Sequence, residues 1–314
     1  MKRYRDYNSY LREIFGERVQ KISLDAGLNC PNRDGTLSDK GCIFCDSRGS
    51  GTGAMINHGL SIDEQIVKGQ KFAAKRYKAN KYIAYFQSFS NTYAPVSRLR
   101  ELYSSALKRE GMVGLSIGTR PDCVDHDVLE MIRSFNKDYH VWIEFGLQSA
   151  HDKSLKKINR GHDVACFERS VRMANEYGLD ICVHVILGLP GETKGMMMDT
   201  ARYISNLPIS GVKIHLLYVV SGTALADMYK KREYRCMERD EYVERVVDFL
   251  ELLPETFVIQ RLTGDPIRSE FLAPLWALEK TDTLKLIDKR MKERDTWQGK
   301  KNRASIAGKW NRMD

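Results

Sequence analysis

Short apolar runs alternate with longer amphipathic stretches from about residue 20 onward. The apolar runs predict six β-strands, at residues 18–26, 81–89, 112–119, 140–148, 180–188 and 211–220. The stretches between them have apolar positions at helical spacing, at residues 61–77, 96–110, 126–137, 162–178 and 193–207. Six strands are fewer than the eight of a closed barrel. The pattern therefore predicts an α/β fold, a partial (β/α)6 TIM-type barrel whose sheet stays open.

The pattern changes character after about residue 222. Residues 223–254 read as helical, residues 256–264 as one strand, and the remainder as a polar tail. We therefore divide the chain into three parts: a short N-terminal extension (1–20), the barrel (21–222) and a mainly helical C-terminal extension (223–314). Within the barrel, Ser61 and Glu64 have the spacing of a capping box and predict where the first of its helices begins.

The composition is that of an ordinary soluble protein, because 42% of the 314 residues are hydrophobic and 29% are charged. The N-terminus has no apolar core of signal-peptide length. No other run approaches the roughly 18 apolar residues of a membrane span. We expect a cytoplasmic protein that does not associate with a membrane.

The formal net charge of +9 suggests a polyanionic partner, although net charge alone is a weak pointer to nucleic acid. Residues 280–314 contain eleven basic and five acidic side chains, a local charge of 11 − 5 = +6. Trp297 and Trp310 lie in this tail and have rings suited to stacking on bases. The competing interpretation is a solvated charged helix with no ligand.

Three of the seven cysteines are clustered in the stretch CPNRDGTLSDKGCIFCD, as Cys30, Cys42 and Cys45. Thiols of the cytosol are kept reduced, which favours metal-binding or catalytic roles over disulfides. The cluster directly follows the first predicted strand, at the barrel face where active sites are built. Three thiolates suit an iron–sulfur cluster with one open iron. A zinc site wants a fourth ligand, for which His58 is the nearby candidate, and thiols without metal are the third possibility.

The ordered motifs of the chain resemble the radical S-adenosylmethionine superfamily. They are LDAGLNCPNRDGTLSDKGCIFCD, YFQSFSNTYAP, IGTRPDCV, EFGLQSAHDKSLKKINRGHD and HVILGLPGET. Within the superfamily they are similar to the bacterial YtqA/YhcC-type (MnmL-like) family, which is related to the Elongator catalytic subunit and to oxygen-independent coproporphyrinogen oxidase. The resemblance implies a partial barrel, a [4Fe–4S] cluster on Cys30, Cys42 and Cys45, and S-adenosyl-L-methionine as cofactor. The eleven residues between the first two cysteines exceed the commonest superfamily spacing and are typical of this family.

The same resemblance implies which strand ends hold the cofactor. After the second strand, Gln87, Ser88, Ser90 and Asn91 stand where relatives contact the methionine part; the alternative is a strand end capped by its own polar side chains. The remaining implied cofactor ligands, found on later strands, are Glu144, Gln148, Arg160, His184 and Gly188.

Three of these later residues have a competing structural interpretation. The planar guanidinium of Arg160 is suited to binding the methionine carboxylate, and the alternative is a salt bridge on the protein surface. Glu144 is otherwise a structural hydrogen-bond acceptor, and His184 stands where the coproporphyrinogen enzyme has an acid, so core packing is its alternative. Substrate-side candidates at the barrel mouth are Arg120, Cys123 and His215. For Cys123 and His215 the alternative is a buried core residue, which is the usual role of an isolated cysteine.

The resemblance implies reductive cleavage of S-adenosylmethionine to a 5′-deoxyadenosyl radical, with an electron donor such as flavodoxin or ferredoxin. Together with the basic tail it favours tRNA as substrate, and conversion of the carboxymethylaminomethyl group of wobble uridine 34 to aminomethyl. Two alternatives stay open: a radical enzyme acting on a small metabolite, and a zinc-stabilised RNA-binding protein without catalysis.

Overall fold

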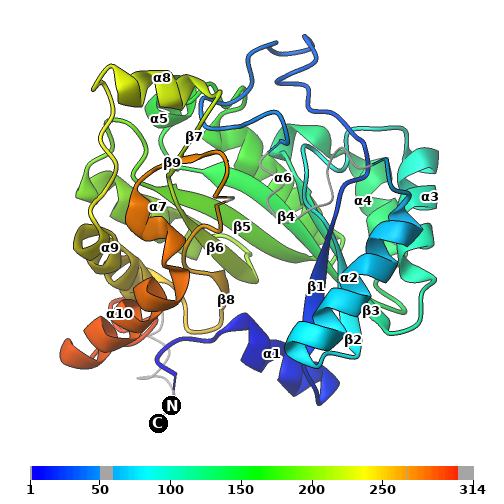
Figure 1. Cartoon of the computed structure of the whole chain (residues 1–314). Coiled ribbons are helices and arrows are strands. Elements are labelled where there is room, and N and C mark those ends of the chain that lie inside the picture. The colour runs from blue at the N-terminus through cyan, green and yellow to red at the C-terminus, as the bar shows by residue number, and fades with distance from the viewer. Residues whose placement is uncertain (1, 50–58, 267, 303–314) are drawn as a thin grey trace.

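A computed structural model describes residues 2–49, 59–266 and 268–302. Its centre is a curled seven-stranded parallel sheet in the order β1-β2-β3-β4-β5-β6-β8 (Figure 1). These strands are β1 (Val19–Leu24), β2 (Lys81–Phe86), β3 (Met112–Thr119), β4 (His140–Gln148), β5 (Asp180–Leu187), β6 (Gly211–Leu216) and β8 (Val258–Arg261). All six predicted barrel strands are confirmed, and the strand predicted at 256–264 continues the same sheet as β8. The sheet order runs from β1 to β8 without closing, which confirms the open partial barrel.

Helices cover the outer face of the sheet. The helices that follow the barrel strands are α2 (Ile62–Tyr77), α3 (Val96–Leu107), α4 (His126–Arg133), α5 (Asp152–Lys157), α6 (Val164–Glu176) and α7 (Lys194–Ser205), with a short 3-10 turn at Pro121–Cys123. The apolar core fills the space between these helices and the sheet. The predicted capping box is present, because the Ser61 hydroxyl accepts from the Glu64 N–H while Glu64 accepts from the Ser61 N–H. That reciprocal pairing satisfies two backbone groups that a helix start otherwise leaves unpaired.

The N-terminal extension packs under the opening of the barrel (Figure 1). It contains α1 (Tyr7–Phe15), and just before this helix Asp6 forms a β-bridge with Ile259 of β8. The Ile259 N–H donates to the carbonyl of Arg5 at 2.8 Å. Tyr7 packs edge-on against Trp142, so aromatic rings close the amino-terminal end of the barrel. The pocket described below is therefore approached from the carboxyl ends of the strands.

The C-terminal part differs from the sequence prediction in two places. The helix expected at residues 223–254 is divided into α8 (Ala224–Lys230) and α9 (Arg239–Leu252), with Arg232 in a left-handed conformation between them. The strand expected at 211–220 ends at Leu216, because the chain then leaves the main sheet. Its last residues form β7 (Val219–Val220), which pairs antiparallel with β9 (Phe271–Ala273). A 3-10 turn (Leu275–Leu278) and α10 (Lys280–Glu293) complete the described chain.

The described part of the basic tail is largely paired within the protein. Six of its basic side chains make ion pairs with acids of the same chain: Lys280, Lys285, Lys289, Arg290, Arg294 and Lys301. Lys300 lies 4.8 Å from the centre of the Trp297 ring. Residues 303–314, including Trp310, lie outside the described residues. Up to residue 302 the tail thus packs α10 against α9, as expected for a charged helix with a structural role. The division of the chain at residues 20 and 222 stays a prediction.

Candidate active site at the mouth of the barrel

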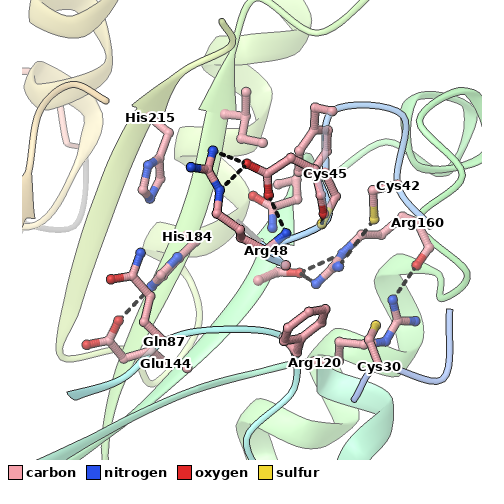
Figure 2. A pocket seen from close by; sticks show the side chains of 18 of the residues that line it. Cys30, Cys42, Cys45, Arg48, Gln87, Arg120, Glu144, Arg160, His184 and His215 are labelled. Carbon is pink, nitrogen blue, oxygen red and sulfur yellow. Dashed lines mark hydrogen bonds and ion pairs between the residues drawn. The ribbon is translucent and has the colours of Figure 1, made fainter. Parts of the chain in front are cut away.

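The three clustered cysteines line one pocket at the carboxyl ends of the strands. Cys30, Cys42 and Cys45 belong to the segment that follows β1, and none of the three forms a disulfide within the described residues. The Cys45 N–H donates to the Cys42 carbonyl at 2.9 Å, which makes the tight turn between the paired cysteines. Figure 2 shows the three sulfur atoms at one side of the pocket and Glu144, His184 and His215 at the other.

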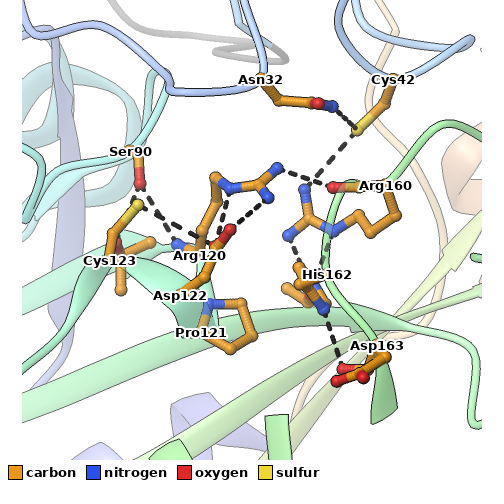
Figure 3. A network of polar contacts seen from close by, with 12 residues as sticks. Asn32, Cys42, Ser90, Arg120, Pro121, Asp122, Cys123, Arg160, His162 and Asp163 are labelled. Atoms are coloured by element: carbon orange, nitrogen blue, oxygen red, sulfur yellow. Dashed lines mark hydrogen bonds and ion pairs between the residues drawn. The ribbon is translucent and has the colours of Figure 1, made fainter. Parts of the chain in front are cut away.

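Nitrogen donors point at the most buried of the three sulfur atoms (Figure 3). The Cys42 Sγ accepts from Asn32 Nδ2 at 3.7 Å and from Arg160 Nη1 at 3.6 Å. The donor set of three thiols fits an iron–sulfur cluster bound through three corners. The pocket-lining histidines that are described lie at the opposite side, where they do not complete a four-ligand zinc site with these cysteines.

Arg160 is held in place by the backbone of β4. Its Nε and Nη2 donate to the Gly146 carbonyl at 3.1 and 2.6 Å, which leaves Nη1 directed at Cys42. Arg120 donates from Nη1 to the Arg160 carbonyl at 2.8 Å and forms a two-pronged ion pair with Asp122 (Figure 3). A planar guanidinium fixed by such paired bonds is pre-organised for a carboxylate.

Gly146 leaves the room that this arginine needs. A Cβ atom added there would lie 2.6 Å from Arg160 Nη2 and 2.7 Å from Gln148 Nε2. We expect Gly146→Ala to displace both side chains and to weaken S-adenosylmethionine binding by roughly 10- to 100-fold, because small misplacements of binding groups are costly. Calorimetric titration of the cofactor into anaerobic protein measures this.

The matched control for this prediction is Gly195→Ala in α7, where the nearest atom to an added Cβ is 3.7 Å away. We expect this variant to bind the cofactor as the unsubstituted protein does. Equal cofactor affinity in both variants would contradict the proposed position of Arg160.

Gln148 and Gln87 also reach the pocket. Gln148 has φ +76° at the point where the β4–β5 register shifts between Gly146 and Gln148. Positive φ is uncommon for a glutamine, and backbone strain of this kind is concentrated at functional sites. The Gln87 side chain lines the pocket, and its Oε1 accepts from the Ser23 hydroxyl at 3.3 Å.

Five other predicted residues do not line this pocket: Ser88, Ser90, Asn91, Cys123 and Gly188. The Ser90 hydroxyl is buried and lies 3.1 Å from the Thr119 hydroxyl. Ser88 is buried, and Asn91 donates to the Gly118 carbonyl at 2.8 Å, which is the strand-end capping considered as its alternative. Gly188 has φ +91°, accepts from the Tyr234 hydroxyl at 3.0 Å and borders a separate hollow. Burial raises the pKa of Cys123 to about 12, so its thiol is protonated at neutral pH. A cofactor or substrate role for these five stays a prediction.

Glu144 is the centre of a polar network inside the barrel. Its carboxylate is buried and accepts from Lys21 Nζ and the Ser116 hydroxyl at 2.6 Å each, and from Lys213 Nζ. His184 Nε2 lies 2.7 Å from Glu144 Oε2. Despite its burial, the two ammonium groups hold the pKa of Glu144 well below its usual range. The carboxylate therefore stays ionised, as a structural acceptor shared by several strands.

Both histidines of this network are neutral at physiological pH. Burial and the nearby Lys213 lower the pKa of His184 to about 4, and burial beside His184 and Arg261 lowers that of His215 well below its usual range. The two rings lie 5.2 Å apart. Both histidines line the pocket, and the Nε2 atom of His184 faces Glu144. A substrate-side role for His215 stays a prediction.

Glu144, Cys182 and His184 place three potential metal ligands within 4.8 Å of one another. Two arguments speak against a metal ion there. Glu144 is already paired with two ammonium groups, which would repel a cation. Burial also raises the pKa of the Cys182 thiol well above its usual range, so it is protonated. We regard this cluster as part of the structural network.

The sequence prediction missed several residues of the pocket and the network: Lys21, Arg33, Phe44, Asp46, Arg48, Tyr85, Phe89, Lys213, Tyr218 and Arg261. Lys213 carried a usable signal, because it is a lysine between Val212 and Ile214 in a mostly apolar strand. A charged side chain at such a position must find a buried partner. The contact of Arg48 with Glu270 carried no signal, since the two residues meet only through the fold. His58 lies outside the described residues.

Comparisons with known proteins agree with this geometry. Residues 30–204 match the model of the radical SAM superfamily, and residues 209–293 match the radical SAM C-terminal domain. The uncharacterized protein YtqA of Bacillus subtilis is 40% identical over 302 residues, which are 95% of this chain and 92% of YtqA. A tRNA uridine(34) acetyltransferase of Methanocaldococcus infernus is 28% identical over 49% of this chain and 29% of its own length.

Among solved structures, the archaeal Methanocaldococcus infernus Elp3 with an N-terminal deletion superimposes with a TM-score of 0.65 at 17% identity. The match covers 89% of this chain and 64% of the Elp3 chain. At this identity the similarity concerns the fold alone, and the fold is the same open barrel. The superfamily match over more than half of the chain and the full-length similarity to YtqA lead to one conclusion: this chain belongs to the radical SAM superfamily.

Proposed function

We propose that Cys30, Cys42 and Cys45 hold a [4Fe–4S] cluster and that the adjoining pocket binds S-adenosylmethionine. The observation that carries the proposal is the meeting of three thiols with Arg160 in one pocket. When bound, the cluster would supply the electron that cleaves S-adenosylmethionine to a 5′-deoxyadenosyl radical. The protein's own part is to bind, orient and exclude water.

Individual residues serve those tasks in the proposal. Arg160 offers its Nη1 donors to a carboxylate next to the cysteines, while Gly146 prevents the guanidinium from turning away. Gln148 and Gln87 supply neutral polar groups on the same wall. Arg120 donates a hydrogen bond to the backbone carbonyl of Arg160, and so its part is the indirect one of positioning Arg160.

For the substrate we propose wobble uridine 34 of tRNA, with conversion of a carboxymethylaminomethyl group to aminomethyl. Support comes from the partial similarity to a protein named tRNA uridine(34) acetyltransferase and from the net charge of +9. Positive charge favours a polyanionic substrate without specifying it. A cytoplasmic location, where tRNA and a donor such as flavodoxin or ferredoxin are present, is part of this proposal. Within the described residues there is no helix long and apolar enough to span a membrane.

Deleting the gene and analysing tRNA nucleosides by mass spectrometry tests the substrate. We expect the carboxymethylaminomethyl nucleoside to accumulate and the aminomethyl nucleoside to fall below detection. An unchanged wobble profile would overturn the tRNA assignment. Complementation with the Cys42→Ala gene should fail, while complementation with the unsubstituted gene should restore the profile.

A small-metabolite substrate is the second candidate, and one observation favours it. The described basic side chains of the tail are mostly paired with acids of the same chain, which reduces the positive surface available to RNA. The two candidates differ in a simple assay: 5′-deoxyadenosine formation by reconstituted protein should rise on adding tRNA only if tRNA is the substrate. Colourless protein with stoichiometric zinc after anaerobic purification would instead support the non-catalytic alternative.

A further inference from the structure

The inner side of the pocket holds more positive than negative charge. Lys21 and Lys213 pair with the single carboxylate of Glu144 at the inner end of the pocket, and Arg261 adds a third basic group that lines the pocket. Asp180, the first residue of β5, lies at the opposite end of the barrel strands. Enclosed like charges without counter-charges are costly. The pKa of Lys213 accordingly falls to about 7 through burial and the neighbouring cations, in spite of its contact with Glu144.

A β-bulge turns Arg261 toward this space. In the β6–β8 pairing Val212 faces Ile259 and Lys213 faces Arg261, so Gln260 is an extra residue in β8. Gln260 and Arg261 therefore both present side chains to the barrel interior, although alternation would send one of them outward. Gln260 Oε1 accepts from Lys21 Nζ at 2.8 Å, and Arg261 lines the pocket. Bulges next to active sites commonly re-aim a side chain in this way.

Arg261 has no acidic partner in the described part of the chain. Of the other arginines in the pocket, Arg48 and Arg120 pair with acids, and Arg33 and Arg160 donate to backbone carbonyls. Two buried nitrogen atoms beside it are also without a hydrogen-bond partner, His215 Nε2 and Gln260 Nε2. Unpaired buried polar atoms are rare and call for an explanation such as a ligand. The imidazole tautomer with the proton on Nε2 makes His215 a donor, as the amide of Gln260 already is.

We propose that Arg261, together with His215 and Gln260, forms an anion subsite that binds a carboxylate on the substrate. The guanidinium provides two parallel donors that match a carboxylate, and the two unpaired nitrogen atoms add further donors. A carboxylate at the end of a short arm reaches this inner wall, whereas a phosphodiester within a polynucleotide backbone would have to bring its neighbouring nucleotides into the barrel. The identity of the arm rests on the proposed function, which removes a carboxymethyl group; the anion subsite itself does not.

The test compares two nucleosides that differ only in the carboxymethyl group, which carries the carboxylate. Titrating 5-carboxymethylaminomethyluridine and 5-aminomethyluridine into anaerobically reconstituted full-length protein should show tighter binding of the first by about 10- to 100-fold, the usual effect of a hydrogen bond to a charged group. Arg261→Gln should abolish this preference, and Arg261→Lys should keep a part of it because the charge remains without the fork. The control Arg98→Gln, an exposed arginine of α3, should retain the full preference. Equal affinities for the two nucleosides in the unsubstituted protein would overturn a carboxylate subsite for this arm.

A second measurement separates this proposal from the proposed function. Sodium acetate should raise the melting temperature of the unsubstituted protein above that in equimolar sodium chloride, and Arg261→Gln should lose the difference, because a ligand that binds the folded state stabilises it. An acetate effect without nucleoside binding would uphold the subsite and count against the wobble-uridine substrate. Normal tRNA conversion by cells carrying Arg261→Gln, with no acetate effect in vitro, would refute the subsite and leave the proposed function standing.

Discussion

Substituting Cys42 by alanine is expected to reduce 5′-deoxyadenosine formation below detection while the barrel stays folded. Cys42 is the most buried of the three clustered thiols, and its sulfur atom receives N–H groups from Asn32 and Arg160. With two thiolates left, one corner of the cluster would lose its protein ligand. Anaerobic reconstitution followed by iron and sulfide determination, and product analysis by mass spectrometry, measures the effect.

The matched control is Cys166→Ala in α6. This cysteine is partly exposed and does not line the pocket, so its loss should leave iron content and product formation unchanged. Asn32→Ala removes the N–H donor to the Cys42 sulfur atom. We expect a loss of about 10- to 100-fold in affinity or activity, which is typical when a residue that would bind a metal loses its hydrogen-bond partner. Full cofactor cleavage by the Cys42→Ala protein would disprove the cluster assignment.

Removing the charge of Glu144 is expected to destabilise the fold by about 3–5 kcal/mol, because it leaves buried cations without their counter-charge. Glu144→Gln keeps the shape of the side chain and one acceptor, yet Lys21 and Lys213 then face a neutral group. Equilibrium unfolding in urea measures the change in free energy. Glu101→Gln, which removes one partner of an exposed ion pair, should change the stability by less than about 0.5 kcal/mol.

Acid titration provides an independent check on the same residue. The pKa of Glu144 is held far below its ordinary value near 4.5 by the ammonium groups. In the unfolded chain Glu144 takes up a proton near pH 4.5, whereas in the folded chain it stays ionised at that pH. The contribution of Glu144 to the free energy of unfolding is therefore present above pH 4.5 and declines as the pH falls further. The Glu144→Gln protein should lack this part of the decline. Parallel stability curves for the two proteins below pH 4.5 would contradict an ionised, paired Glu144.

Much of the fold follows from local pattern. Apolar runs of strand length separated by amphipathic stretches predicted the parallel sheet, since strands buried on both faces are near-continuously apolar. Two breaks were not predicted. The strand ends after residue 216 because the chain goes on to form β7, which pairs with β9 fifty residues further along. The helix ends after residue 230 near a left-handed residue, Arg232, that is not a glycine and so gave no sign in the sequence. The seventh strand was predicted as a strand, but its place beside β6 is a property of the assembled sheet.

The sequence by itself identified the cysteine trio, because the three cysteines lie within sixteen residues of one another. That they hold a cluster stays a proposal. Only the tertiary structure decided what surrounds them. Arg160 contacts Cys42 although 118 residues separate them in the chain. Glu144 on β4 accepts hydrogen bonds from Lys21 on β1 and Lys213 on β6, which lie on either side of it in the sheet. The side chain of Arg261 points into the barrel because β8 has one extra residue, Gln260, in its pairing with β6. Such contacts are set by sheet register and strand order, which side-chain pattern along a single chain does not encode.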